Sequence, residues 1–215
     1  AADFMPHLIQ AGHAPALDRL VLERAAILMM GRPTLRLSIN LAGPTLADNG
    51  FHDRLDALRT DDPTLCDRLI IEVDASDIAR EPHRLRRFIE RLRQSRTGLA
   101  IDNMATGRDD QAQDEMAALS EFRPDFIKIP FNIEAPPAYR SALIGQALSH
   151  DTGVVATRLE TPAQIITAKA LGAHFLQGQA VATLEDDIGL STASNATVWN
   201  PARSVADADK ARIAG

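Results

Sequence analysis

Short apolar runs alternate with amphipathic segments along most of the chain. Six runs predict buried β-strands, at residues 35–40, 69–73, 98–103, 125–129, 153–157 and 174–178. Around them, apolar positions recur at helical spacing and predict helices at 14–30, 51–59, 82–95, 110–121, 138–150 and 162–171. The first of these helices has an apolar side formed by Leu17, Leu20, Val21, Ala25 and Leu28. Strands that are apolar throughout and separated by helices are typical of a parallel sheet.

A polar residue stands at the C-terminal end of each predicted strand. In chain order these are Asn40, Glu72, Asp102 with Asn103, Lys128, Thr157 and Gln177. In a (β/α) barrel such strand ends meet at one rim, where sites are built. One polar residue at a strand end is usually a cap or turn former, but six in six strands favour the barrel. The alternative is an open, doubly wound sheet.

Composition narrows the class of protein. The chain has 215 residues, of which 45% are hydrophobic and 24% charged, which suits one large globular domain. The net charge is −6, and no basic run is interleaved with aromatic residues, so extended nucleic acid is not an expected partner. The arginines of segment 84–96 alternate with apolar residues at helical spacing, so we expect them to form a solvated helix face.

Cysteine and histidine usage gives little sign of a metal or redox site. The single cysteine, Cys66, excludes an internal disulfide and a cysteine-rich zinc site, and it favours a reducing compartment. The six histidines show no spacing typical of a metal site. No apolar run approaches the roughly 18 residues of a membrane span. We therefore expect a cytoplasmic domain without a membrane segment.

Six motifs occur in an order that resembles a known family. They are INLAGPTL (39–46), IIEVDAS (70–76), LAIDNMATG (99–107), FIKIPF (126–131), VVATRLETPAQ (154–164) and LGAHFLQGQ (171–179). Their order and spacing resemble the EAL domains, which hydrolyse the bacterial second messenger cyclic di-GMP with two divalent metal ions. The resemblance implies an α/β fold of the family's kind, a modified (β/α)8 TIM-like barrel with one antiparallel strand.

The resemblance also assigns roles to single residues. Glu72 and Asp102 keep two acids of the family's metal site, Lys128 keeps its cation, and Asn40 and Gln177 keep neutral ligand positions. Four other acids of the family's pattern are missing, and their positions are occupied by Asn103, Pro130, Thr157 and, in a rotated chain order explained below, Ala208. The remnant metal ligands would be Asn40, Glu72, Asp102 and Asn103, and the remnant catalytic groups Glu72, Asp102 and Lys128.

The missing acids bear directly on catalysis. Two dications about 4 Å apart need several carboxylates to offset their repulsion, and Asn103 brings no charge. We therefore expect no efficient hydrolysis and no cofactor, with Mg²⁺ or Mn²⁺ relevant only to residual activity. The resemblance also implies that, in the family, a Glu anchors the loop after the acid pair. The corresponding position in this chain is Ala75.

Ligand binding is a separate question from catalysis. Arg158 is a cation that the family's pattern lacks, beside Thr157, and Glu160 matches the second Glu of its motif. With Asn40, Gln177 and Arg212, these residues form the expected ligand-binding set. A rim with fewer acids and more cations repels a dianionic dinucleotide less when metals are absent.

The C-terminal segment raises a question of chain order. Ser194-Asn195-Ala196 resembles an expression-tag scar, which normally stands at an N-terminus. Residues 197–215 resemble the strand that the family places before residue 1, with Arg212 at the Arg after Glu-Ala-Leu. The predicted organisation is therefore a barrel domain at 1–193, with 194–215 as a scar plus the first barrel strand in a rotated numbering. The alternative is a polar C-terminal tail.

Taken together, the sequence predicts a catalytically inactive EAL-like domain that acts as a regulatory or interaction module in cyclic di-GMP signalling. The first alternative is a metal-independent cyclic di-GMP receptor, and the second is a weak phosphodiesterase. The expected partners are cyclic di-GMP, an unidentified protein and a second copy of the chain, because relatives dimerise through helices near the acid-pair loop.

Overall fold

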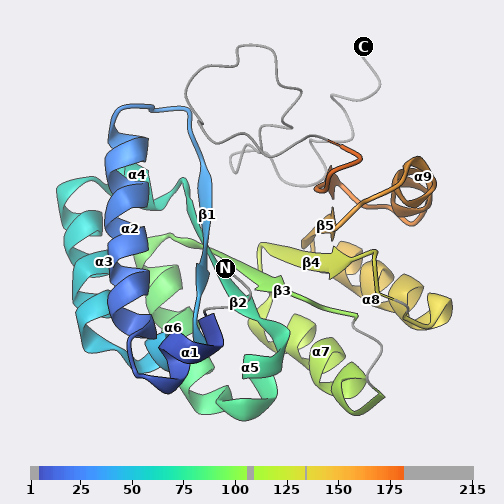
Figure 1. Ribbon diagram of the computed structural model, residues 1–215, viewed down its shortest axis with the longest axis horizontal. Coiled ribbons are helices and arrows are strands. Elements are labelled where there is room, and N and C mark those ends of the chain that lie inside the picture. Colours follow the sequence, from blue (N-terminus) through green and yellow to red (C-terminus); the bar gives the residue numbers. More distant parts are fainter. Residues whose placement is uncertain (1–4, 106–108, 134, 182–215) are drawn as a thin grey trace. The chain divides into compact units, whose positions relative to one another are not determined.

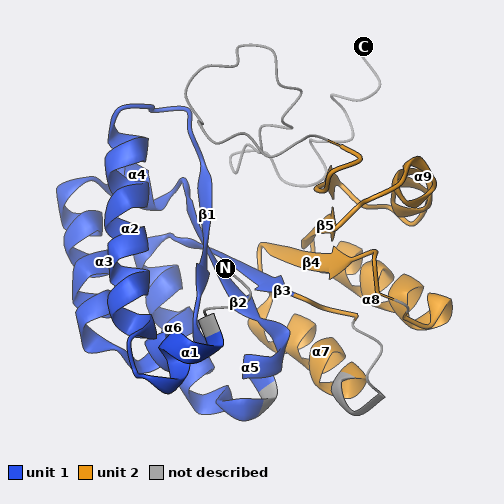
Figure 2. Cartoon of the chain, viewed as in Figure 1, with its two compact units in different colours: residues 1–102 blue, residues 103–215 orange. Residues whose placement is uncertain are grey.

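The computed structural model describes residues 5–105, 109–133 and 135–181 of the chain. Figure 1 shows the helices and strands in sequence colours. The chain divides into two compact units, residues 1–102 and 103–215 (Figure 2). Each unit is described by itself.

Unit 1 alternates helices with three parallel strands. Its elements are α1 (Met5–Gln10), α2 (Ala14–Met30), β1 (Leu37–Leu41), the 3-10 helix η1 (Gly43–Ala47), α3 (Asn49–Asp61), α4 (Pro63–Cys66), β2 (Leu69–Asp74), α5 (Ala75–Arg80), α6 (Pro82–Ser95) and β3 (Gly98–Asp102). Strand β2 pairs with β1 on one side and with β3 on the other. Aspartates begin three of the helices, because the carboxylates of Asp48, Asp62 and Asp74 accept backbone N–H groups from the first turns of α3, α4 and α5.

The core of unit 1 follows from the helical pattern. Helix α6 buries Leu85, Phe88, Ile89 and Leu92, and its arginines lie on the exposed side, as the sequence predicts. The rings of Phe51 and Phe88 pack with their centroids 6.3 Å apart.

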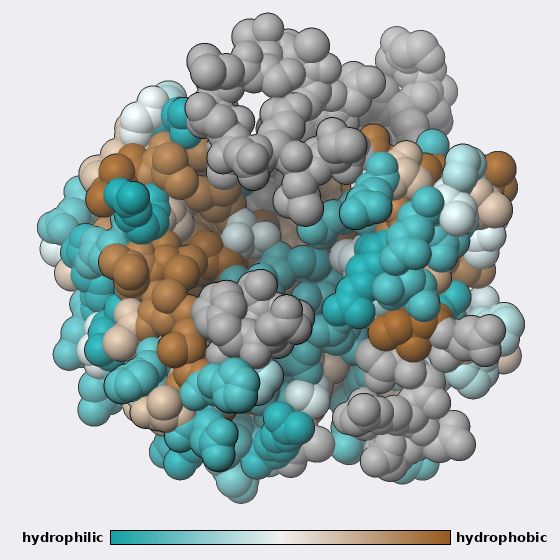
Figure 3. Space-filling view, in the orientation of Figure 1, coloured by the Kyte–Doolittle hydropathy of each residue, from teal (hydrophilic) through white to brown (hydrophobic). Residues whose placement is uncertain are grey.

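Helix α2 buries a different side from its most apolar one. The residues that face the core are Ala14, Asp18, Leu22, Ala25, Ala26 and Met29. Leu20 and Leu28 are instead 59% and 38% exposed, and apolar side chains gather on this part of the surface (Figure 3). Because α2 carries apolar residues nearly all round, periodicity alone does not choose its rotation. The polar contacts of Asp18, described below, do.

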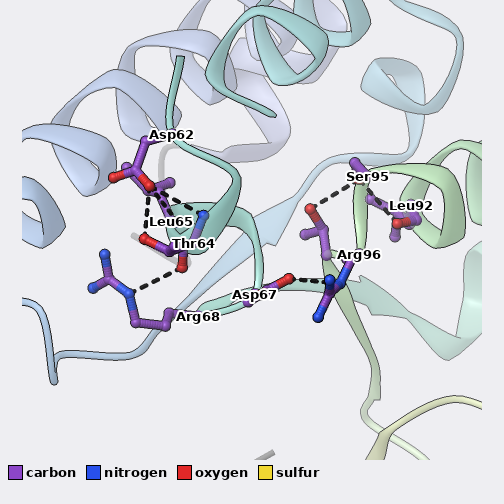
Figure 4. A network of polar contacts seen from close by, with 9 residues as sticks. Asp62, Thr64, Leu65, Asp67, Arg68, Leu92, Ser95 and Arg96 are labelled. Carbon is purple, nitrogen blue, oxygen red and sulfur yellow. Dashed lines mark hydrogen bonds and ion pairs between the residues drawn. The ribbon is translucent and has the colours of Figure 1, made fainter. Parts of the chain in front are cut away.

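Polar contacts tie together the segments that lead into β2 and β3 (Figure 4). The Arg68 guanidinium, which is 9% exposed, donates to backbone carbonyls of the turn between α2 and β1. Nearby, Arg96 forms an ion pair of 3.0 Å with Asp67, and the Ser95 hydroxyl donates to the Leu92 carbonyl. These contacts lie at the N-terminal ends of the strands, opposite the ends that carry the predicted site.

Unit 2 continues the alternation of helix and strand. Its elements are α7 (Asp109–Phe122), β4 (Phe126–Pro130), α8 (Pro137–Ser149), β5 (Gly153–Thr157), α9 (Pro162–Ala170) and β6 (Phe175–Leu176). Strand β5 pairs in parallel with β4 and with β6. Helix α9 begins with a capping box, in which Thr161 and Gln164 satisfy each other's backbone N–H groups.

The predicted α/β class is confirmed, and each of the six predicted strands and six predicted helices is present with bounds that differ by a few residues. The short helices α1, α4 and α5 were not predicted. The first barrel strand that we placed in 197–215 lies outside the described residues, and the strand pairs within each unit are parallel. No helix in the described part of the chain is long and apolar enough to cross a membrane.

Candidate functional site

In unit 1, three predicted site residues lie on one face of the sheet near the C-terminal strand ends. Asn40 on β1 is the register partner of Glu72 on β2, and Glu72 is the partner of Ala100 on β3. Asp102 lies two residues beyond Ala100 and therefore points to the same face. Glu72 is 4% exposed, whereas Asn40 is exposed. Within this unit, the strand register therefore places the three residues on one face of the sheet.

The loop that follows Asn40 is held by a buried carboxylate that the sequence analysis missed. Asp18 of α2 accepts hydrogen bonds from the Ala42 N–H at 2.9 Å and from the Thr45 hydroxyl at 2.5 Å. Burial raises the pKa of Asp18, and the two hydrogen bonds oppose that rise. The available signal was an acid at position 18, in the i, i+4 series with Ala14 and Leu22.

Two further acids lie at the end of β2 and in the first turn of α5. The Asp74 carboxylate accepts the Ser76 N–H at 2.8 Å and starts helix α5, and Asp77 is 9% exposed. Burial, with Asp74 as a lesser cause, raises the pKa of Asp77. Its carboxylate lies so close to Gly43 that a Cβ there would be 2.5 Å from Oδ1. Glycine at position 43 therefore allows the loop after β1 to approach α5.

In unit 2, the ends of β4 and β5 bring two uncharged residues together. Pro130 is the register partner of Thr157, and both are buried. The resemblance places acids at both positions, so this pair of strand ends offers one hydroxyl and no carboxylate. Lys128, two residues before Pro130, is half-buried and lies beside Val155.

The loop after β3 places Asn103 against Arg158. The Arg158 guanidinium donates to the Asn103 side-chain oxygen at 3.1 Å, and both residues have left-handed backbone, with φ of 54° and 57°. Asn tolerates this conformation better than most residues do. The amide of Asn103 thus accepts a hydrogen bond from a cation at the position where the resemblance implies a metal-bridging acid.

Two further residues that the sequence analysis missed hold the same loop. Glu115 of α7 accepts the Ala105 N–H at 2.8 Å, and it also accepts the Tyr139 hydroxyl of α8 at 2.5 Å. Glu115 is 2% exposed. The only sequence signal was an acid inside the apolar pattern of helix 109–122.

Glu160 borders an open pocket of about 760 Å³ in unit 2. The Asn132 amide donates to its carboxylate at 3.4 Å. On the same wall, the Arg140 guanidinium lies over the Phe131 ring, 4.6 Å from its centroid. The pocket therefore combines an apolar wall with one exposed acid and one half-buried cation.

Gln177 lies at the end of β6 with its side chain exposed. Its N–H donates to the Ala156 carbonyl at 2.8 Å, and its own carbonyl accepts the Leu159 N–H at 3.2 Å. Gly178, with φ of 154°, makes this close approach feasible, because a Cβ there would lie 2.3 Å from the Leu159 backbone. Arg212 and Ala208 fall outside the described residues.

The donors of unit 2 do not fit a pair of dications. The groups that could ligate a metal at the positions of the family's acids are the amide of Asn103 and the hydroxyl of Thr157. Pro130 offers no side-chain ligand. Arg158 adds a positive charge directly on Asn103. Among residues 5–105, 109–133 and 135–181, no group of three or more His, Cys, Asp and Glu side chains is placed to hold a metal ion.

Comparison with known proteins gives a consistent family. A family model described as "EAL domain" matches residues 1–183. No curated protein sequence matches the chain.

Three solved structures have similar folds. The FimX EAL domain of Xanthomonas citri, in complex with c-diGMP, is 17% identical, with 84% of this chain and 74% of that one covered and a TM-score of 0.73. The phosphodiesterase PaMucR, in a c-di-GMP complex, is 22% identical, with coverages of 85% and 82% and a TM-score of 0.73. A Vibrio cholerae LapD fragment bound to c-di-GMP is 22% identical, with a TM-score of 0.70. The match covers 80% of this chain but only 43% of the LapD fragment.

Proposed function

The chain belongs to the EAL domain family, and from this premise we propose that it is a catalytically inactive EAL domain acting as a regulatory or interaction module in cyclic di-GMP signalling. The observation that carries the proposal is the hydrogen bond from Arg158 to Asn103. The family's chemistry needs negative charge at this position to hold two metal ions. Here the position carries a neutral amide that is engaged by a cation.

Electrostatics support this reading. A carboxylate at position 103 would attract a dication, whereas Asn103 offers one carbonyl oxygen that already accepts from Arg158. A guanidinium beside the ligand repels a metal ion, and this repulsion grows as water is excluded from the site. Pro130 and Thr157 give no compensating charge at the neighbouring strand ends. Glu72 and Asp102 are then remnants of a catalytic site.

The test is turnover of cyclic di-GMP by the purified chain with Mn²⁺ or Mg²⁺. We expect no linear dinucleotide product above a protein-free blank. Glu72→Gln is the control variant, because it removes one remnant acid while keeping the shape of the side chain. Turnover that the wild-type chain shows and that E72Q abolishes would overturn the proposal in favour of a weak phosphodiesterase.

A second candidate function is a metal-independent receptor for cyclic di-GMP. The exposed guanidinium of Arg158 favours it, because an arginine can bind a phosphodiester directly where the family uses metals. The complexes of FimX, PaMucR and LapD with this dinucleotide support the choice of ligand. Asn40, Glu160, Gln177 and Arg212 are the further ligand contacts that we propose.

Calorimetry separates the two functions. Heat of binding in EDTA that Arg158→Ala abolishes supports the receptor. Arg123→Ala is the matched control, because Arg123 is an exposed arginine of the same unit that lies at the N-terminal side of β4. No heat with or without Mg²⁺ supports a module that binds only proteins, in which case sedimentation would show whether the partner is a second copy.

We further propose that residues 194–215 hold a tag remnant and the first barrel strand, and that the domain works in the cytoplasm. A gene in which 194–215 precede Ala1 tests the chain order. The reordered protein should have a higher melting temperature than the protein in which 194–215 follow residue 193. An unchanged or lower melting temperature would favour the polar tail.

A further inference from the structure

The loop after β3 has a backbone that its sequence does not favour. Asn103 and Ala105 both have left-handed φ angles, of 57° and 59°, on either side of the fully buried Met104. Asn adopts this conformation fairly readily, but alanine has no side-chain group to stabilise it. Such a conformation persists only where the surrounding structure holds it.

Two hydrogen bonds from outside the loop hold it within unit 2. The Met104 N–H donates to the Lys128 carbonyl at 3.1 Å, which ties the loop to β4. The Ala105 N–H donates to a carboxylate oxygen of Glu115 at 2.8 Å. The bond to Glu115 is expected to be stronger than the bond to the Lys128 carbonyl, because its acceptor is a carboxylate that is removed from water.

Glu115 is itself held from a third element. The Tyr139 hydroxyl of α8 donates to the same oxygen at 2.5 Å and lies 3.4 Å from the Ala112 carbonyl. Burial, and secondarily Glu115, raises the pKa of Tyr139 far above its usual value, so the hydroxyl stays a donor over the whole working range of pH. The carboxylate is thus held by α7, which carries it, and by the Tyr139 hydroxyl of α8.

We propose that Glu115, oriented by Tyr139, is a positioning residue that sets the loop at Ala105 and thereby holds Asn103 against Arg158. Only Met104, anchored to Lys128, separates Ala105 from Asn103. A change at Glu115 therefore reaches the Asn103–Arg158 contact without touching either residue. This role of Glu115 does not depend on whether the domain binds cyclic di-GMP.

The chain offers a matched control for simple packing between α7 and α8. The Gln146 amide of α8 also reaches α7, where it donates to the Met116 carbonyl and to the Ser120 hydroxyl, each at 2.8 Å. These bonds are as short as that of Ala105 to Glu115, but they do not involve the loop. Gln146→Ala loosens the two helices and leaves the contact at Ala105 intact.

Amide hydrogen exchange followed by NMR on the full chain tests the proposal. Glu115→Ala should speed exchange of the Ala105 amide about tenfold or more, the factor expected for losing a hydrogen bond to a buried charged acceptor. Tyr139→Phe should give a smaller increase, and Glu115→Gln, which keeps an acceptor oxygen, should restore much of the protection. Gln146→Ala should leave Ala105 unchanged.

A second signal distinguishes positioning from general destabilisation. The side-chain amide resonance of Asn103 should move in E115A in the same direction as in Arg158→Ala, while amides of β2 in unit 1 keep their exchange rates. The proposal is overturned if Ala105 exchanges equally fast in E115A and the wild-type chain. It is also overturned if Q146A has the same effect as Y139F, or if the Asn103 resonance responds to R158A but not to E115A.

Discussion

Replacing Arg68 by methionine should destabilise the domain more than replacing any exposed arginine. The Arg68 side chain donates to four backbone carbonyls, three of which belong to the end of α2 and the turn into β1. Met keeps the length and apolar character of the stem and removes every donor.

The magnitude follows from the contacts. The distances are 2.9, 3.1 and 3.3 Å from Nη1 to the carbonyls of Leu35, Arg32 and Met29, and 3.1 Å from Nε to that of Thr64. Nη1 has two N–H groups, so the four contacts amount to about three full hydrogen bonds, each worth about 1 kcal/mol net. Removing a buried charge returns part of this. The free energy of unfolding should therefore fall by roughly 2–4 kcal/mol.

Urea denaturation followed by circular dichroism measures this loss, and the melting temperature should fall by roughly 5–15 °C. Arg96→Met is the control, since Arg96 lies in the same region, pairs with Asp67 at 3.0 Å and is 77% exposed (Figure 4). An exposed pair of this kind contributes about 0–1 kcal/mol. Arg68→Lys should fall between wild type and R68M, because one ammonium cannot reproduce the fork of donors.

Two results would contradict this prediction: R68M lowers the free energy of unfolding by less than about 1 kcal/mol, or R96M lowers it as much as R68M does. Either result would mean that the carbonyls find other donors, or water, once the guanidinium is gone. The loss should also reach the site face of unit 1. The Leu37 N–H bonds to the Arg68 carbonyl at 3.2 Å, and this contact begins the register that sets Asn40 beside Glu72.

Two further predictions concern pH and a tight backbone contact. The buried His52 donates from Nε2 to the Leu46 carbonyl, its Nδ1 has no partner in the described part of the chain, and burial lowers its pKa below the usual 6.5. Below pH 6.5 the unfolded chain therefore gains a proton that the folded chain does not, so the free energy of unfolding should fall by up to about 1.4 kcal/mol per pH unit. His52→Gln should flatten this slope in urea titrations between pH 7 and 5. Gly178→Ala should lower the melting temperature by roughly 5–10 °C through its clash with Leu159, whereas Gly145→Ala, in open space on α8, should raise it by about 2 °C. Equal melting temperatures for the two glycine variants would refute the assigned clash.

Much of the fold could be predicted because its signals are local. Each strand is a short apolar run and each long helix repeats its apolar positions, so the spacing along the chain is enough to locate them. The side of α2 that faces the core could not be predicted in this way. Its apolar residues surround the helix, and Asp18 fixes the rotation through bonds to a loop more than 20 residues away.

For the candidate site, the sequence could propose residues by motif order but could not give their contacts. Motif order identified Asn103 and Arg158 as departures from the family's pattern, but only the structure shows that they bond to each other. They are 55 positions apart in the chain, and no periodicity relates them. Glu115 was also missed, because an acid within a helix is expected to face solvent unless its partners in other elements are known.

The sequence by itself determined the class of fold, the order of strands and helices, the family, and the uncharged residues Asn103, Pro130 and Thr157 where the resemblance implies acids. Each of these depends on residue type and on spacing between near neighbours. Tertiary structure decided which side of α2 is buried, that Pro130 lies beside Thr157, and that Glu115 and Tyr139 hold the loop after β3. Those facts arise from strand register and from hydrogen bonds between residues that are distant in the chain, and neither leaves a periodic pattern in the sequence.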